Sequence, residues 1–256
     1  MTPLATFHDL KDASVFITGG GVGIGAALTE AFIAQGAKVA FVQRSDASAF
    51  VAEVEGRQAR APLFIPCDLT DIDALKAAIA QAAAAHGPVT VLVSNAANDN
   101  RHTTEQLSVA DWDANLAVNL RHYFFAAQAV LPGMIAAKGG SIINMSSTSY
   151  MLGLGEYPAY VTANAGIMGL TRGHAREFGP HGIRVNAVMP GWVMTERQQR
   201  LWVTEEKLAG HLGRQCIKQA IQPEDLTGGV LYLASSASKM LTGQAIVIDG
   251  GTVVTG

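Results

Sequence analysis

The chain is 256 residues long, with 49% apolar residues, 15% charged residues and a formal net charge of −3. This composition excludes an intrinsically disordered chain, and the lack of a Lys/Arg run excludes a protein that binds nucleic acid through a basic surface. The first residues, MTPLATFHDLKD, do not resemble a secretory signal, and no apolar run reaches the roughly 20 residues of a membrane span. We therefore expect a soluble, cytoplasmic protein without membrane or nucleic-acid partners.

Short apolar runs alternate with longer helix-like stretches along the chain. Apolar, β-branched runs of this length are typical of strands that helices cover on both faces. The predicted strands are Ser14–Thr18, Lys38–Val42, Leu63–Pro66, Val89–Ser94, Ser141–Met145, Ile183–Val188 and Ala245–Ile248. The predicted helices are Ile24–Gln35, Ile72–His86, Asp111–Ala137, Pro158–Phe178 and Pro223–Ala234.

This alternation predicts an α/β protein with a single domain over residues 1–256, in which seven parallel strands form a doubly wound sheet with helices on both faces. Ligands bind such sheets at the carboxyl ends of the strands. The region of about 190–222 interrupts the alternation and contains Trp192 and Trp202 among charged residues. We interpret it as a substrate-covering segment with one or two short helices, and a solvated connection is the alternative.

The sequence offers no sign of a disulfide or a metal site. Cys67 and Cys216 lie far apart in the chain, and the seven histidines have no metal-ligand spacing. We expect ordinary reduced thiols and no bound metal.

A glycine-rich stretch, TGGGVGIG at 18–25, follows the first strand and opens the first helix. A dinucleotide pyrophosphate needs a tight turn, close backbone approach and free N–H groups at a helix N-terminus, and glycines allow all three. A plain strand–helix turn is the alternative interpretation. The residues that we expect at the pyrophosphate are Gly19, Gly21, Val22, Gly23 and Ile24.

The end of the second strand indicates which dinucleotide binds. An acidic residue there would bind the adenine ribose hydroxyl of NAD, but the chain has Gln43, Arg44 and Ser45. Arg44 can pair with the 2′-phosphate of NADP, and Ser45 can add a hydrogen bond. NADP is therefore favoured and NAD remains open; Arg44 is alternatively a plain surface residue.

Two further motifs follow the third and fourth strands. Asp68, before Leu69, either contacts the adenine amino group or caps the helix that begins near Asp71. The small residues Ala96 and Ala97 let the chain pass beneath the cofactor, while Asn95 ties adjacent strands together.

The reacting groups are predicted from Ser147, Tyr160 and position 164. Alcohol oxidation needs a base, and a tyrosine with its usual pKa of ~10 is about 0.1% ionised at pH ~7. A neighbouring ammonium ordinarily lowers that pKa by ~3 units, which corresponds to roughly 4 kcal/mol. Asn164 carries no charge and offers only a hydrogen bond to the nicotinamide ribose. Ser147 is expected to hold the substrate oxygen.

Two other positions complete the expected site. Asn119 lies mid-helix between apolar neighbours, which indicates an inward amide that bends the helix and holds a water for proton relay. The turn Pro190–Gly191, followed by Val193 and Thr195, is expected to direct backbone groups and a hydroxyl to the nicotinamide carboxamide or the phosphates.

With these residues in hand, the whole chain resembles a short-chain dehydrogenase/reductase. The motifs match that family in order and spacing: the glycine-rich loop, Asp68, NAA at 95–97, Asn119, Ser147, Tyr160 and Pro190–Gly191. The resemblance implies a Rossmann fold, an NAD(P) cofactor, and a tetrad of Asn119, Ser147, Tyr160 and a lysine where this chain has Asn164. It also implies a homotetramer that packs through the long helices and the C-terminal strand.

A more detailed likeness is to bacterial aldopentose 1-dehydrogenases that act on D-xylose or L-arabinose, which oxidise the ring C1 hydroxyl to a lactone. It lies in NDNRH at 98–102, NLRH at 119–122, LGL at 152–154, TERQ at 195–198 and QC at 215–216. The D-xylose enzyme has aspartate where Gln43 stands, so this chain is expected to use NADP or both dinucleotides and a different sugar. The residues expected at the sugar hydroxyls are Asn98, Ser147, Tyr150, Tyr160, Trp192, Arg197 and Gln198. Tyr150 and Trp192 are alternatively packing residues.

The sequence therefore predicts an oxidoreductase that transfers hydride from C1 of a cyclic aldose to NAD(P)+. Asn164 is either an inactivating, engineered substitution or a natural change that is compensated elsewhere. One alternative is a non-catalytic protein that binds dinucleotide or sugar. Another is a short-chain dehydrogenase for a different alcohol or ketone, and the polar stretch at 98–102 argues against it.

Overall fold

Seven parallel strands form the central sheet of the computed structural model, which describes residues 5–254. Their order is β3-β2-β1-β4-β5-β6-β7, so the sheet grows in opposite directions from β1 and β4. A ligand crevice opens at such a switch point, beyond the carboxyl ends of the strands. The strands are β1 (Ser14–Thr18), β2 (Lys38–Gln43), β3 (Leu63–Pro66), β4 (Val91–Ser94), β5 (Gly140–Met145), β6 (Ile183–Pro190) and β7 (Ala245–Ile248). The predicted doubly wound, Rossmann-like sheet is confirmed.

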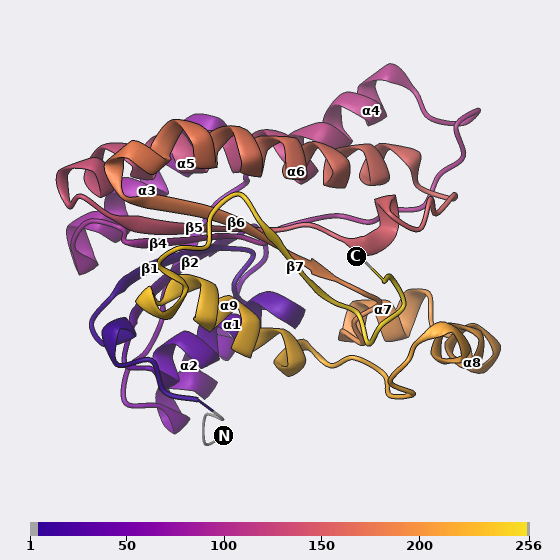
Figure 1. Cartoon of the computed structure of the whole chain (residues 1–256), viewed down its shortest axis with the longest axis horizontal. Helices are drawn as coiled ribbons and strands as arrows, with labels where there is room; N and C mark the ends of the chain where they lie inside the picture. Colours follow the sequence, from indigo (N-terminus) through magenta and orange to yellow (C-terminus); the bar gives the residue numbers. More distant parts are fainter. Residues whose placement is uncertain (1–4, 255–256) are drawn as a thin grey trace.

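Helices cover both faces of this sheet (Figure 1). One face carries α3 (Ile72–His86), α5 (His122–Ala136) and α6 (Pro158–Phe178), and the other carries α1 (Gly23–Ala34), α2 (Ser48–Arg57) and α9 (Thr227–Ala234). Three more helices are α4 (Val109–Leu116), α7 (Glu196–Leu201) and α8 (Glu205–Arg214). The last two lie in the 190–222 region, the predicted covering segment, beyond one end of the sheet (Figure 1), where one or two short helices were predicted.

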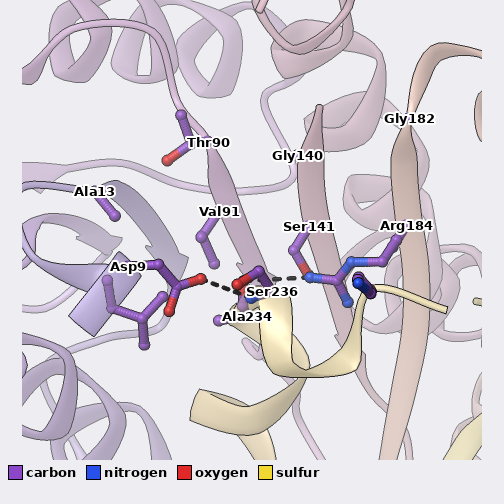
Figure 2. A pocket seen from close by; sticks show the side chains of 12 residues that line it. Asp9, Ala13, Thr90, Val91, Gly140, Ser141, Gly182, Arg184, Ala234 and Ser236 are labelled. Carbon is purple, nitrogen blue, oxygen red and sulfur yellow. Dashed lines mark hydrogen bonds between the residues drawn. The ribbon is translucent and has the colours of Figure 1, made fainter. Parts of the chain in front are cut away.

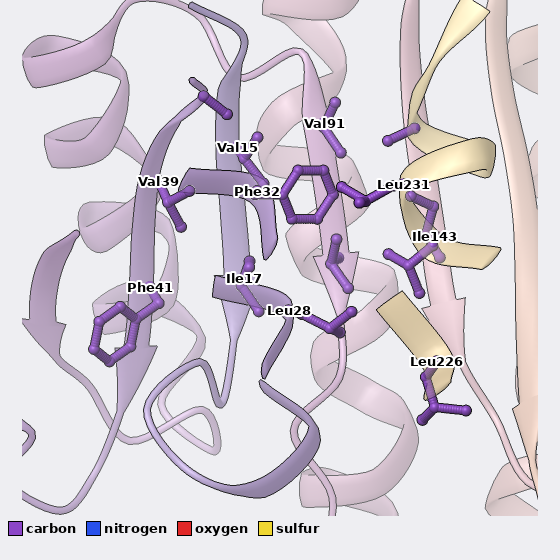
Figure 3. Packing of buried hydrophobic residues seen from close by; sticks show 14 of the residues in the cluster. Val15, Ile17, Leu28, Phe32, Val39, Phe41, Val91, Ile143, Leu226 and Leu231 are labelled. Carbon is purple, nitrogen blue, oxygen red and sulfur yellow. The ribbon is translucent and has the colours of Figure 1, made fainter. Parts of the chain in front are cut away.

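Apolar side chains fill both interfaces between the sheet and the helices. Successive strand residues point to opposite faces, so Ile17 packs toward α1 and α9 while Phe16 packs toward α3 and α5, and both are fully buried. Figure 3 shows the first of these cores, in which Leu28 and Phe32 of α1 meet the strands and Leu231 of α9. Burial on both faces explains why the strands are continuous apolar runs.

The structure differs from the predicted elements in a few places. Helix α2 had no counterpart in the prediction. Val54 is the buried residue of this helix, and the remaining positions give only a weak apolar periodicity. The predicted helix at 111–137 is divided into α4, a π-helical turn at Ala117–Arg121 and α5. The predicted helix at 223–234 begins with a 3-10 turn, Pro223–Leu226, and β4 begins at Val91, two residues late.

None of the helices within residues 5–254 combines the length and the apolar character needed to cross a bilayer. Both cysteines are free thiols, as expected: Cys67 is buried and Cys216 is exposed.

Candidate active site

The turn between β1 and α1 leaves backbone N–H groups open at the start of the helix. Gly19 and Gly23 have φ angles of 70° and 53°, a region that favours glycine. A Cβ at Gly25 would lie 1.8 Å from the carbonyl oxygen of Gly19, so only glycine permits this approach of helix to turn. The N-cap residue, Val22, supplies no side-chain hydrogen bond to the first turn. Free N–H groups at the positive end of a helix bind anions, so this cradle fits a dinucleotide pyrophosphate.

The end of β2 presents a neutral amide where an acidic residue would select NAD. The buried Gln43 side chain accepts a hydrogen bond from the Gly21 N–H (2.9 Å) and donates one to the Ser45 carbonyl (3.1 Å). Arg44 and Ser45 are exposed beside it. The strand therefore ends in a neutral amide that is followed by an arginine and a serine, with no acidic side chain at positions 43–45.

Asp68 follows β3 and does not cap α3. Its carboxylate accepts hydrogen bonds from the N–H (2.9 Å) and hydroxyl (2.7 Å) of Thr70. These hydrogen bonds hold the pKa of Asp68 below its usual value, and the charge of Arg44 contributes. The N-cap of α3 is Asp71, which accepts from the N–H groups of residues 73 and 74, so the capping alternative for Asp68 is wrong. The neighbouring Leu69 is buried and belongs to the core.

Asn95 ties β4 to β1, as expected. Its amide nitrogen donates to the carbonyl oxygens of Thr18 (3.2 Å) and Gly19 (3.1 Å). In return, the Thr18 hydroxyl accepts from the N–H groups of Asn95 and Ala96. The chain then passes along the glycine-rich turn, and Ala97 lines the small cavity described below.

Asn119 lies at the π-helical turn and points inward. It is 1% exposed, and its side chain accepts from the Asn98 N–H (2.7 Å) and donates to the Asn98 carbonyl (3.0 Å) and to Asn115 (3.0 Å). The amide thus fixes the start of the 98–102 segment next to the site. The predicted water relay stays a prediction.

A cavity of about 80 Å³ at the carboxyl ends of the strands is lined by Tyr160 and Asn164, whereas Ser147 lies beside Tyr160 and does not line the cavity. Tyr160 and Asn164 reach it from α6, one turn apart, and the Asn164 amide donates back to the Tyr160 carbonyl at 2.9 Å. Ser147 follows β5 and accepts a hydrogen bond from the Ser149 N–H at 3.1 Å. The cavity is lined by Ile24, Asn95, Ala97, Asn119, Tyr123, Met145, Ser146, Tyr160, Asn164, Ile167 and Pro190.

The electrostatic surroundings of Tyr160 favour the neutral phenol. Burial raises the pKa of Tyr160 to about 12, the negative charge of Asp99 adds to this rise, and hydrogen bonds to Asn164 and Ser147 counteract it. The two groups that lower the pKa are both neutral. At pH ~7 a phenol with this pKa is ionised to roughly one part in 10⁵.

The segment after β6 packs against the glycine-rich turn. A Cβ at Gly23 would lie 3.0 Å from the Thr195 methyl group, so Thr195 packs against the glycine-rich turn. Its hydroxyl caps α7 through the Gln198 N–H at 3.2 Å. The Pro190 carbonyl accepts from Thr148 (3.2 Å), the Gly191 N–H donates to β7 (3.0 Å), and the buried Val193 bridges to Ile221.

Arg197 joins the covering segment to the loop after β4. Its guanidinium donates to the side-chain oxygens of Asn98 (3.2 Å), Asp99 (3.3 Å) and Asn100 (2.8 Å), which are about a hundred positions away in sequence. We call these four residues the polar clasp. It places two predicted sugar ligands, Asn98 and Arg197, in direct contact.

Gln198 connects Trp192 to the same clasp. Its amide donates to Asp99 at 2.7 Å and accepts from the Trp192 indole N–H at 2.9 Å. The indole also contacts His211 edge-on, with ring centroids 5.4 Å apart. Asp99 is a site residue that the sequence analysis missed, because its partners are distant in sequence; the only signal was its place in the NDNRH stretch.

Tyr150 is oriented differently from the other predicted sugar ligands. Its hydroxyl lies 3.8 Å from the sulfur of Met189, and its ring packs on the cluster that includes Met168 and Ala187. This arrangement agrees with the packing alternative, and a sugar contact stays a prediction.

Comparison with known proteins identifies the family. A family model described as enoyl-(acyl carrier protein) reductase matches residues 20–253. A solved structure titled short-chain dehydrogenase/reductase from Serratia marcescens BCRC 10948 superposes with a TM-score of 0.89, at 34% identity, covering 96% of this chain and all of the other. The chain is a short-chain dehydrogenase/reductase.

Two curated relatives of this short-chain dehydrogenase/reductase are named for sugars. A probable galactose dehydrogenase of Rhizobium meliloti (strain 1021) is 50% identical over 251 residues, 97% of this chain and 98% of the relative. A D-xylose 1-dehydrogenase of Caulobacter vibrioides is 45% identical over 249 residues, 96% of this chain and 98% of the relative. Membership in the family implies an NAD(P) cofactor, which the glycine-rich cradle fits.

Proposed function

We propose that this short-chain dehydrogenase/reductase oxidises C1 of a free cyclic aldose to the lactone, with NADP favoured over NAD as the hydride acceptor. The observation that carries the proposal is the meeting of Tyr160, Ser147 and a dinucleotide cradle beside a clasp of uncharged and charge-balanced polar side chains. The names of the galactose and D-xylose relatives support an aldose. L-arabinose and D-xylose are the first candidate substrates. D-galactose, which has the L-arabinose ring configuration plus a hydroxymethyl group, is the hexose to compare.

The chain's own groups divide the chemistry between them. The bound nicotinamide supplies the hydride acceptor. The Ser147 hydroxyl holds the C1 oxygen, and the Tyr160 oxygen takes the proton that leaves the C1 hydroxyl, so the sugar loses a hydride and a proton. The clasp residues Asn98 and Arg197 and the amide of Gln198 bind the remaining hydroxyls, while the face of Trp192 covers the sugar C–H surface.

NADP is favoured because of the end of β2. Gln43 is neutral, so it does not repel a 2′-phosphate. Hydrogen bonds to the Gly21 N–H and the Ser45 carbonyl hold its amide in place. Arg44 is exposed and forms no ion pair with any of the residues 5–254. A guanidinium without an ion-pair partner can form two parallel hydrogen bonds to a phosphate, so Arg44 suits the 2′-phosphate.

We also propose that Asn164 leaves the chain an impaired enzyme. The side chain is 3% exposed, and its amide donates to the Tyr160 carbonyl. Because the amide is neutral, it offers the phenol no positive charge. The same observation supports a second candidate function, a non-catalytic protein that binds dinucleotide or sugar.

A substrate panel on the chain and on its Asn164→Lys variant tests the proposal. Each of L-arabinose, D-xylose and D-galactose is supplied with NADP or NAD, and reduced nicotinamide is followed by absorbance. We expect lactone formation in the variant, faster with NADP. Binding of dinucleotide and sugar by calorimetry, without turnover in either protein, would support the non-catalytic function instead.

A homotetramer is proposed as the assembly. Helix α5 exposes Phe124 (45%) and Ile135 (37%), and the edge strand β7 leaves all of its side chains only partly covered. Exposed apolar side chains on a helix face and a free sheet edge suit contacts with further copies. Sedimentation equilibrium measures the mass directly, and a monomer at micromolar concentration would contradict the proposal.

A further inference from the structure

A row of four side chains links the covering segment to the tyrosine in the cavity. The Arg101 guanidinium carbon lies 3.8 Å from the ring centroid of Tyr157 and 5.1 Å from that of Trp202. Tyr157 in turn stacks on Tyr160, with centroids 5.2 Å apart and ring planes inclined by 27°. We call Trp202, Arg101, Tyr157 and Tyr160 the ring stack. It runs from the end of α7 to the reacting phenol without a break.

His102, the residue after Arg101, is hydrogen-bonded to the backbone at the start of α6. The N–H of His102 donates to the Glu156 carbonyl at 2.6 Å, and the His102 Nε2 accepts from the Ala159 N–H at 3.3 Å. Helix α6 begins at Pro158 and has no side-chain cap of its own, so His102 supplies an acceptor that the first turn otherwise lacks. The first turn of α6, which carries Tyr160, is therefore held by the 98–102 segment.

The chemistry of Arg101 suits a position between two rings. Its side chain is 24% exposed, and Tyr157 is 6% exposed, so the contact is largely shielded from water. A guanidinium is flat and weakly hydrated and stacks on aromatic faces, whereas an ammonium is a compact, strongly hydrated charge. Its ion pair with Glu156 is long, at 3.8 Å, and Glu156 is 75% exposed, so the rings rather than the carboxylate hold it.

We propose that Arg101 is a positioning residue, which couples closure of the covering segment to the orientation of the Tyr160 ring. When Trp202 is in place, Arg101 contacts both rings and supports Tyr157 against Tyr160. When the covering segment moves away, Arg101 loses its contact with Trp202 and the Tyr160 ring loses part of its support. This inference rests on the proposed function only in taking Tyr160 as the reacting group.

Hydrogen exchange of the full chain tests the coupling without any turnover. In Arg101→Met and in Trp202→Leu we expect exchange in residues 196–214 to speed up about fivefold or more, and the double variant to exchange no faster than the faster single variant. Arg172→Met is the control, because Arg172 is an exposed arginine on α6 outside the stack. Unchanged exchange in Arg101→Met, or additive effects in the double variant, would overturn the coupling.

Steady-state kinetics in the Asn164→Lys background test the positioning role. We expect Arg101→Met to lower kcat about tenfold, because a misplaced base slows the reaction, while KM for the sugar and Kd for the dinucleotide stay the same. Arg101→Lys should not rescue kcat, since an ammonium does not stack. A raised KM with unchanged kcat would overturn positioning and indicate a sugar contact. If the Asn164→Lys enzyme oxidises no aldose, the proposed function fails, while the exchange experiment still decides the coupling.

Discussion

The two ends of the sheet each hold a cavity, and the larger one is not at the proposed site. At the amino ends of β4, β5 and β6 a cavity of about 300 Å³ is lined by Asp9, Ser141, Arg184 and Ser236, among others (Figure 2). At the carboxyl ends the cavity around Tyr160 measures only about 80 Å³. The larger volume therefore does not coincide with the proposed site.

The chemistry of the two cavities differs. At the amino ends, the Arg184 guanidinium donates to the carbonyls of Leu233 (2.8 Å), Ala234 (3.3 Å) and Ser235 (3.1 Å), which end α9. A cation that binds the last carbonyls of a helix stabilises its negative end. At the carboxyl ends, by contrast, the Tyr160 phenol has a raised pKa, and Asn164 and Ser147, the groups that lower it, are neutral. The polar groups of the first cavity are thus committed to a helix end, whereas the second cavity holds an ionisable group whose charged form is disfavoured by its surroundings.

The largest expected effect concerns Asn164, at the cavity by the carboxyl ends of the strands. Asn164→Lys should raise kcat/KM for aldose oxidation ~100-fold or more, since a cation worth ~3 kcal/mol to the phenolate changes the rate by about that factor. Initial rates with L-arabinose and D-xylose measure it. Asn164→Gln is the neutral control and should show no such rise. Equal rates for the lysine variant and the unchanged chain would contradict the assigned role of position 164.

Arg184→Met tests the cavity at the amino ends of the strands. Leaving the α9 carbonyls unpaired should lower the free energy of unfolding by about 2–3 kcal/mol, because hydrogen bonds from a charged donor are lost. Urea denaturation followed by circular dichroism measures this change. Dinucleotide affinity should stay the same, and Arg176→Met, on an exposed arginine, is the stability control. Loss of dinucleotide binding in a folded Arg184→Met protein would mean that the two ends are not separate.

The raised pKa of Tyr160 predicts a steep pH dependence. The phenolate is the active form, so with a pKa of about 12 the oxidation rate of the chain should rise with pH and reach no plateau below it. The slope expected for one ionisation is about tenfold per pH unit between pH ~7 and ~10. In Asn164→Lys the rate should level off at lower pH. A rate that is independent of pH in the chain as it stands would show that Tyr160 is not the base.

The smallest expected effect concerns the dinucleotide. Arg44→Ala should weaken NADP binding about tenfold, because one charge-assisted contact with the 2′-phosphate is lost, and should leave NAD binding unchanged. Fluorescence titration with each dinucleotide measures both constants. An equal loss for NADP and NAD would argue against the phosphate contact and leave Arg44 as a surface residue.

Most of the fold could be predicted from local patterns. The strands and the long helix at 158–178 were predicted to within about two residues, because each contains its own apolar periodicity and, for α6, a proline at its start. Helix α2 was missed because its surface is mostly solvated. An inward, helix-bending amide at Asn119 was predicted, but its form, a π-helical turn bonded to the backbone of Asn98, was not, because Asn98 lies 21 positions away in the chain.

The site, like the fold, has features that follow from local sequence patterns and features that depend on contacts between distant segments. The sequence by itself determined the glycine-rich cradle, the serine and tyrosine, and the missing lysine, because each depends on residue type and short-range spacing. The ion pair of Arg197 with Asp99 and the contacts of Arg101 with Tyr157 and Trp202 follow only from the folded arrangement. Those contacts join segments that lie far apart along the chain, and the reason they form is that parallel strands deliver the loops at their carboxyl ends to one edge of the sheet.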